Sequence, residues 1–171
     1  MPCTEAQLFS FLDGIGIQHQ TTRHPPLFTV EEARDWHDKI PGTSCKNLFL
    51  KDKTGQFWLV VMPAEKRADL KGIAQRIGAA KLYFAKSGEM LEVLGLTPGA
   101  VTPFALLNDT GRKIRVVLDQ EMLECEYVNY HPLHNAASTT LRAKDLVKFI
   151  EALGYEPLIA ECGHIQVANS V

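Results

Sequence analysis

Apolar and polar side chains alternate most clearly along residues 45–52, and this stretch predicts a central β-strand. Successive side chains of a strand point to opposite faces, so Leu48 and Leu50 fall on one face and Asn47 and Phe49 on the other. Both faces carry apolar residues, which indicates a strand inside the molecule rather than at its edge.

A turn and a second strand follow. Residues 52–55 have turn composition, and residues 57–62 are almost wholly apolar, which predicts a return strand covered on both faces. Lys46 and Asn47 lie at the start of this hairpin. A lysine on a rigid strand beside an amide can bind an anion or a carbonyl group, but spacing alone favours a solvated lysine at a strand end.

The remaining pattern predicts helices and short strands around the hairpin. Capping-box patterns at residues 4–7 and 29–32 open two helices, and helical apolar spacing marks three more at residues 69–78, 87–95 and 146–154. Further strands are expected at residues 18–23, 81–85, 104–107, 114–118, 125–130, 137–141 and 155–159. We expect 104–107 and 114–118 to form a hairpin, and 163–171 to be a frayed tail.

Length and composition place limits on the class of protein. A chain of 171 residues with 46% apolar and 22% charged residues is typical of one soluble globular domain, here residues 1–162. No run is long and apolar enough to span a bilayer, and the first residues lack a signal-peptide pattern, so we expect a cytoplasmic protein. The four cysteines form no C-x-x-C pair, which indicates reduced thiols.

Positive charge is concentrated in one part of the chain. Residues 39–86 hold ten basic and three acidic residues, a local net charge of +7 in a chain whose net charge is −2. A one-sided basic surface can bind a phosphate backbone even on an acidic protein. A set of solvated surface lysines is the competing interpretation.

Two other stretches are candidates for a ligand site. Residues 95–104 contain two glycines and two prolines, which indicates a shaped loop whose N–H groups can face a ligand oxygen, although a tight connection has the same composition. His131 and His134 are spaced like helical metal ligands, but Pro132 makes that helix improbable, and we expect no metal.

A cysteine nucleophile is also considered. Lys46 can lower the pKa of the neighbouring thiol of Cys45, and His131 with Asn135 can supply a base and an orienting partner. Against this, adjacent residues of a strand point to opposite faces, so the thiol and the cation separate.

In these same stretches the sequence resembles the prolyl-tRNA editing domain family, which includes the insertion domain of bacterial prolyl-tRNA synthetases and free-standing YbaK-type deacylases. The resemblance covers nearly the whole chain. It rests on residues 45–50, on the loop Gly95-x-x-Pro98-Gly99-x-Val101-Thr102-Pro103, and on His131-Pro132-Leu133-His134-Asn135 followed by Thr139-Thr140.

The resemblance implies an α+β fold with a mixed, mostly antiparallel central sheet or partial barrel surrounded by about five helices. It also implies trans-editing hydrolysis of the ester of mischarged tRNA(Pro), with Ala-tRNA(Pro) as the substrate of the branch that this sequence is most similar to. The partners would be the tRNA(Pro) acceptor end and prolyl-tRNA synthetase, for a monomer without a cofactor. Cys-tRNA(Pro) deacylation and a non-catalytic tRNA- or synthetase-binding module are the alternatives.

The family's site residues can then be placed on this sequence. The implied catalytic residues are Lys46 and His131. The implied substrate-binding residues are Asn47, Pro98, Gly99, Thr102, Pro103 and Asn135. Within the basic span we assign tRNA binding to Lys51, Lys66 and Arg67. Leu48, Phe49, Met62 and Tyr130 are candidate walls of a pocket sized for a methyl group, and the hypothesis requires the three stretches to meet at one metal-free cleft.

Overall fold

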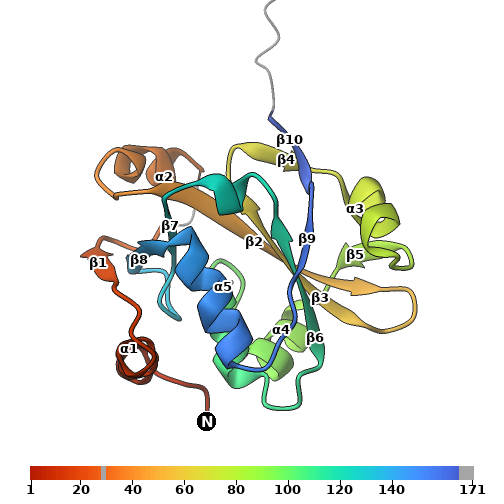
Figure 1. The fold of residues 1–171 in the computed structure, drawn as a ribbon, viewed down its shortest axis with the longest axis horizontal. Helices are drawn as coiled ribbons and strands as arrows, with labels where there is room; N and C mark the ends of the chain where they lie inside the picture. The colour runs from red at the N-terminus through yellow and green to blue at the C-terminus, as the bar shows by residue number, and fades with distance from the viewer. Residues whose placement is uncertain (28–29, 166–171) are drawn as a thin grey trace, which may run out of the picture.

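The long strand β2 (Thr43–Asp52) runs diagonally through the molecule and joins the two halves of its sheet (Figure 1). The structure, a computed structural model, describes residues 1–27 and 30–165. On one edge β2 pairs with β3 (Phe57–Pro63) from Cys45 to Lys51, in the hairpin that the sequence predicts. This pairing makes β2 and β3 the centre of the fold.

Eight strands form the main sheet, in the order β1-β8-β7-β2-β3-β6-β9 with β5 also paired to β2. The other strands are β1 (Gln20–Arg23), β5 (Leu82–Phe84), β6 (Ile114–Asp119), β7 (Tyr127–Tyr130), β8 (Ala137–Arg142) and β9 (Leu158–Ala160). The pairs β7–β2, β3–β6 and β6–β9 are parallel and the others are antiparallel, as expected for a mixed, mostly antiparallel sheet.

The second edge of β2 is shared by two short strands. Thr43 and Ser44 pair with β7, and residues 50–52 pair with β5. Between these contacts, β2 lies beside a loop instead of a strand. The side chain of Asn47 donates a hydrogen bond to the carbonyl of Val101 in this loop. The middle of β2 therefore has a loop, and not a strand, at this edge.

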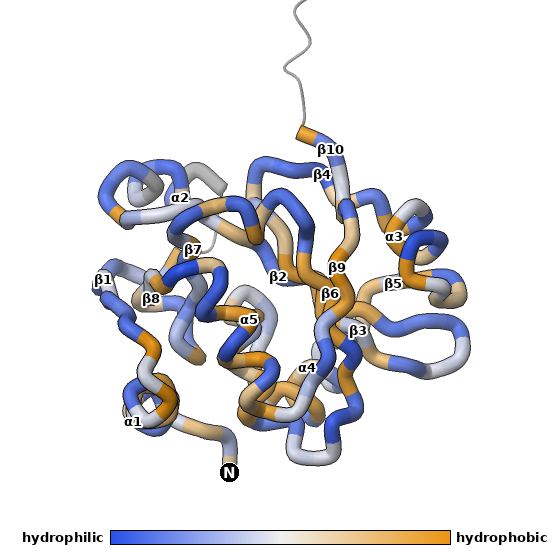
Figure 2. Tube along the Cα trace, viewed as in Figure 1, coloured by the Kyte–Doolittle hydropathy of each residue, from blue (hydrophilic) through white to orange (hydrophobic). Residues whose placement is uncertain are grey.

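Among the residues that the structure describes, five α-helices surround the sheet, as the sequence predicts. They are α1 (Glu5–Gly14), α2 (Val30–His37), α3 (Leu70–Ile77), α4 (Ser87–Leu94) and α5 (Ala143–Ala152). The larger core packs α1, α4 and α5 against one face of the sheet, while α3 covers the other face. Strand β3 supplies both cores, since Leu59 and Val61 face the first and Trp58 and Val60 the second. Figure 2 shows apolar residues gathered on β3, β6 and β9. None of the described helices is long and apolar enough to cross a membrane.

The strand predicted at residues 104–107 is wrong. This segment forms the 3₁₀ helix η1 (Pro103–Asn108), which begins where the hydroxyl of Thr102 accepts a hydrogen bond from the N–H of Phe104. Proline suits the first helical position because its missing N–H would have no partner there. The predicted hairpin with residues 114–118 is therefore also wrong, and β6 pairs in parallel with β3 and β9.

Residues 163–165 belong to the fold and not to the expected frayed tail. Strand β10 (Gly163–Ile165) pairs antiparallel with β4 (Lys66–Ala68), a short strand that the sequence pattern does not reveal. The rest of the predicted tail, 166–171, and Thr29 of the second capping box lie outside the described residues.

Candidate active site

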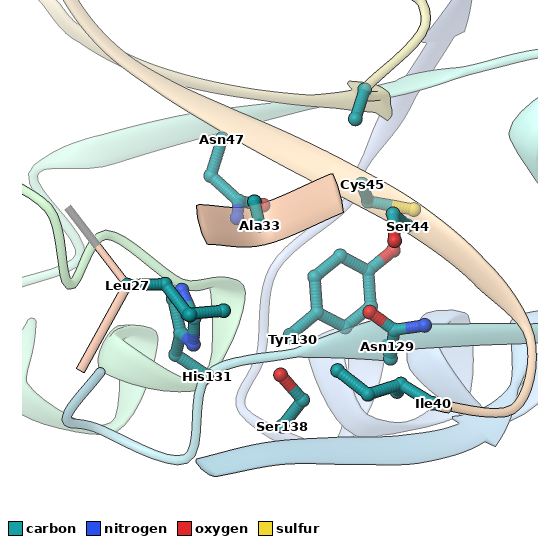
Figure 3. Close-up of a pocket in the computed structure, with 11 residues that line it drawn as sticks. Leu27, Ala33, Ile40, Ser44, Cys45, Asn47, Asn129, Tyr130, His131 and Ser138 are labelled. Carbon is teal, nitrogen blue, oxygen red and sulfur yellow. The ribbon is translucent and has the colours of Figure 1, made fainter. Parts of the chain in front are cut away.

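A small cavity of about 180 Å³ opens where β2, the end of β7 and the segment before β2 meet (Figure 3). Figure 3 shows Asn47 and Cys45 reaching toward it from β2, with Tyr130 and His131 approaching from the end of β7. The lining consists of Leu27, Ala33, Ile40, Ser44, Cys45, Asn47, Ala64, Asn129, Tyr130, His131 and Ser138. The cavity is therefore apolar on one side and polar where the strands end.

Asn47 presents an unused hydrogen-bond acceptor at this cavity. Its Nδ2 donates to the carbonyl of Val101 at 3.1 Å, which fixes the orientation of the amide. Its Oδ1 is buried and has no hydrogen-bond partner in the described part of the chain. A buried acceptor without a partner carries a free-energy cost of about 1–3 kcal/mol, which a donor on a bound ligand would remove.

His131 presents a second acceptor. Its Nδ1 lies 3.0 Å from the carbonyl oxygen of Ala137, and a carbonyl can only accept, so Nδ1 carries the proton. Nε2 of the neutral ring then has a free lone pair. Burial lowers the pKa of His131, and the ring is neutral at neutral pH.

Cys45 does not have the properties of a nucleophile. Burial raises the pKa of its thiol to about 12, so the thiol stays protonated at neutral pH. Its Sγ faces the carbonyl of Thr43 at 3.5 Å. The cysteine-hydrolase hypothesis therefore lacks its thiolate, and Cys45 contributes to the cavity as a small apolar wall.

Lys46 does not line the cavity, contrary to the expectation that it would share a cleft with His131. It pairs with Met62 of β3 and lies between two residues that do line the cavity, so its side chain leaves the opposite face of β2. The side chain is partly buried, and this burial lowers the pKa of the ammonium group. The catalytic role expected for Lys46 therefore stays a prediction.

The loop after α4 and the segment after His131 meet in a separate groove of about 380 Å³. Pro98 and Asn135 both line it, so these two segments meet, but in a groove separate from the cavity and not in the single cleft that the hypothesis requires. Gly99 is exposed in the loop with a φ of +93°, in the left-handed region that favours glycine.

Thr102 and Pro103 do not fit the expected substrate contacts. Both are buried, and they form the beginning of η1. Their side chains are used to end the loop and start the 3₁₀ helix, so they shape the loop rather than face a ligand.

The structure corrects one of the three residues assigned to tRNA. Lys66 is only 2% exposed, and its ammonium donates to both oxygens of the buried Asp119, at 3.2 and 3.0 Å. Burial acts to lower the pKa of Lys66, but the hydrogen bonds to Asp119 and Glu121 outweigh it and raise the pKa. Lys66 thus forms an internal ion pair and is not exposed to contact a phosphate. Arg67, the next residue, is exposed.

The side chain of Lys51 is half-buried and forms an ion pair. Its Nζ lies 2.6 Å from the carboxylate of Glu89 on α4 and 5.4 Å from the centre of the Phe57 ring. A phosphate would have to compete with Glu89 for this cation.

Several cavity residues were not anticipated from the sequence. Of the four expected wall residues, only Tyr130 lines the cavity, because Leu48 and Met62 face the core beneath α3 and Phe49 the core on the other side. Ser44, Asn129 and Ser138 belong to no sequence motif, and only their positions near strand ends distinguish them.

Within the described residues, no group of three or more His, Cys, Asp or Glu side chains is arranged to hold a metal ion.

Comparisons with known proteins identify the family and the fold. Residues 24–149 match the aminoacyl-tRNA editing domain family. The chain is 37% identical over 144 residues to the prolyl-tRNA editing protein ProX of Acetoanaerobium sticklandii, covering 84% of this chain and 88% of that protein. It is 36% identical over 159 residues to prolyl-tRNA synthetase associated domain-containing protein 1 of Bos taurus, covering 90% and 92%. A solved structure of a hypothetical protein, APE2540, has the same fold, with a TM-score of 0.74, 22% identity, and coverage of 94% of this chain and 100% of that one.

Proposed function

Because this chain belongs to the aminoacyl-tRNA editing domain family, we propose that it is an aminoacyl-tRNA deacylase that edits mischarged tRNA(Pro). Its similarity to a prolyl-tRNA editing protein over 84% of the chain supports the choice of tRNA. The partners are then the acceptor end of tRNA(Pro) and, in the same pathway of charging and correction, prolyl-tRNA synthetase.

The observation that carries the proposal is the pair of acceptors at the cavity. An aminoacyl ester has a protonated α-amino group with three N–H donors, and the cavity offers it the unpaired Oδ1 of Asn47 and the free Nε2 of His131. Hydrogen bonds to a charged group are each worth about 1.5–3 kcal/mol, so two would orient the ester firmly.

The size of the cavity supports a small amino acid. At about 180 Å³ it is smaller than the roughly 300–1,000 Å³ of typical ligand pockets, so it suits the aminoacyl group and leaves the nucleotides outside. Leu27, Ala33 and Ile40 give the apolar wall that a methyl side chain would contact. Alanine is the proposed substrate, and cysteine, whose side chain is nearly as small, is the alternative.

Hydrolysis of the aminoacyl ester requires mainly that the substrate and the water be held in the correct positions. The ester is already activated, and water can attack once the carbonyl is oriented and its developing negative charge is stabilised. Lys46 does not line the cavity, so we assign its cation to the terminal ribose or phosphate rather than to the carbonyl. We assign the loop around Pro98 and Gly99, with Asn135 across the groove, to the nucleotide that follows.

Deacylation of Ala-, Cys- and Pro-tRNA(Pro), measured in the presence of a chelator, tests the proposal. We expect the fastest hydrolysis for Ala-tRNA(Pro), very little for Pro-tRNA(Pro), and a loss of about 10- to 100-fold in kcat/KM for Lys46→Ala, because a hydrogen bond from a cation to the ribose or phosphate is worth about 1.5–3 kcal/mol. Cys45→Ala is the matched control from the same strand and should keep its turnover, because the neutral thiol takes no part in the reaction.

Two results would contradict the deacylase. Absence of turnover on all three substrates with retained tRNA binding would favour the non-catalytic module instead, which the position of Lys46 outside the cavity also allows. Loss of activity in Cys45→Ala with an active Lys46→Ala would favour the cysteine-dependent mechanism.

A further inference from the structure

A second histidine lies directly behind the cavity wall. His24, just after β1, is 6% exposed, and its Nε2 is 2.9 Å from the hydroxyl of Ser138. Ser138 is 4% exposed and lines the cavity from β8. The two residues are 114 positions apart in the sequence, and only the pairing of β1 with β8 brings them together.

The hydrogen bonds of His24 define the direction of its contact with Ser138. Nδ1 lies 2.9 Å from the carbonyl oxygen of Pro25, so Nδ1 carries the proton of the neutral ring. Nε2 must then accept, and the hydroxyl of Ser138 donates to it. This is the arrangement in which a histidine activates a hydroxyl group, with a third group holding the ring in the correct tautomer.

We propose that Ser138 and His24 together receive the proton of the water that attacks the ester. The inference rests on the proposed deacylase function and adds to it the proton acceptor. The water oxygen bonds to the carbonyl carbon while its proton passes to Oγ of Ser138, and the proton of that hydroxyl passes to Nε2 of His24. When the ester C–O bond breaks, the ribose oxygen takes a proton back by the same route, which leaves a free amino acid and tRNA.

The surroundings of His24 suit a ring that becomes positively charged for a moment. The carbonyl of Pro25 accepts from Nδ1 in both states of the ring. The ring of Trp36 from α2 lies 5.5 Å from the ring of His24, and the ammonium of Lys39 lies 4.7 Å from the centre of the same tryptophan ring. The ring centre of His131 is 6.2 Å from that of His24, and burial keeps the His131 ring neutral.

This arrangement also separates the roles of the two histidines. Nε2 of His131 faces the cavity and accepts from the substrate amine, so it is occupied when substrate is bound. His24 does not line the cavity and reaches the water only through Ser138. Ser138 is therefore the group in contact with the reacting water, and His24 acts through it.

Steady-state kinetics of His24→Gln and Ser138→Ala on Ala-tRNA(Pro) test the inference, because glutamine keeps an acceptor for Ser138 but cannot take up a proton. We expect each variant to lose about 10²- to 10⁴-fold in kcat with KM changed by less than about threefold. The double variant should lose little more, because residues that act as a unit are not additive. His19→Gln, a histidine that stacks on Phe9 away from the cavity, is the matched control and should keep its kcat.

The separation of kcat from KM distinguishes catalysis from structural support, because a loss of packing at the cavity wall would also weaken substrate binding and raise KM. If either single variant retains kcat within threefold, or if KM rises as much as kcat falls, the pair is structural and the inference is overturned.

A measurement on the unaltered protein guards against misfolded variants. In mixtures of H₂O and D₂O, a relay moves two protons in one step and gives a curved dependence of kcat on deuterium content. A linear dependence, with one proton moving, would overturn the relay. Failure of the wild-type protein to hydrolyse any of the three esters would instead remove the deacylase function itself, so the two failures are distinguishable.

Discussion

His131 combines two properties that make its protonation matter, namely its place in the cavity and its burial. Burial lowers its pKa below the ordinary value of about 6.5, which the residue regains in the unfolded chain. Between these two pKa values the unfolded chain binds one more proton than the folded protein. The neutral ring therefore contributes stability that is present above about pH 6.5 and is lost as the pH falls.

We expect the pH dependence of stability to change in His131→Gln. Between pH 7 and pH 5, the wild-type protein should lose up to about 2 kcal/mol more free energy of unfolding than this variant, because a shift of one pKa unit corresponds to about 1.4 kcal/mol. Urea titrations at several pH values measure the difference. His19→Gln controls for the loss of an imidazole at another site, and parallel curves for His131→Gln and wild type would contradict the prediction.

At the level of single residues, chemistry was more predictable than position. Asn47 and His131 were expected at the site because the resemblance to the editing-domain family implies it, and both line the cavity. Lys46 was expected there as well, but strand alternation puts it on the opposite face. His24 and Ser138 were missed, since the pattern His24-Pro25-Pro26 indicates only the end of a strand and a serine within a strand carries no signal.

At the level of elements, the errors lie where periodicity is ambiguous. A run of four apolar residues fits a buried strand or one turn of helix equally well, and at 104–107 the hydroxyl of Thr102 and the ring of Pro103 decide for the 3₁₀ helix. The strands β4 and β10 have three residues each, too few for alternation to show. Long elements with caps, such as α1 and α3, were placed correctly because their sequence signals are local.

The pairing of β10 with β4 depends on a glycine, which gives a prediction at this scale. A Cβ on Gly163 would lie 2.0 Å from the carbonyl oxygen of Arg67, a backbone atom that cannot move aside cheaply. We expect Gly163→Ala to destabilise the protein by about 1–3 kcal/mol, the usual cost of overpacking, which lowers Tm by about 2–12 °C in a protein of this size.

Gly88→Ala is the matched control for this substitution. Gly88 lies in α4, and a Cβ there would meet nothing within 4 Å, so alanine should leave Tm unchanged or raise it through its better helix propensity. Thermal unfolding of the two variants checks both expectations. An unchanged Tm for Gly163→Ala would mean that β10 is not held against β4 in solution.

Positive charge is concentrated in residues 39–86 of the chain, and the burial of Lys66 changes how the role of this basic span should be tested. Removing Lys66 leaves Asp119 charged and fully buried, which costs about 3–5 kcal/mol of stability whatever the substrate. Substitutions at Lys66 would thus mimic a loss of tRNA use by unfolding the protein. The test of the basic surface belongs to exposed cations of the same span, of which Arg67 is one.

We expect Arg67→Glu to lower kcat/KM for Ala-tRNA(Pro) by about tenfold and to leave hydrolysis of alanyl-adenosine nearly unchanged, because only the tRNA brings phosphates to this surface. For the same reason, activity on tRNA should fall steeply with salt concentration, as ions released from the phosphates oppose binding, while activity on the small ester should not. Lys144→Glu, an equally exposed charge reversal on α5 outside the basic span, is the matched control. Equal losses on both substrates, or the same loss in Lys144→Glu, would place the tRNA on another face of the protein, and the local charge of +7 would then be ordinary surface solvation.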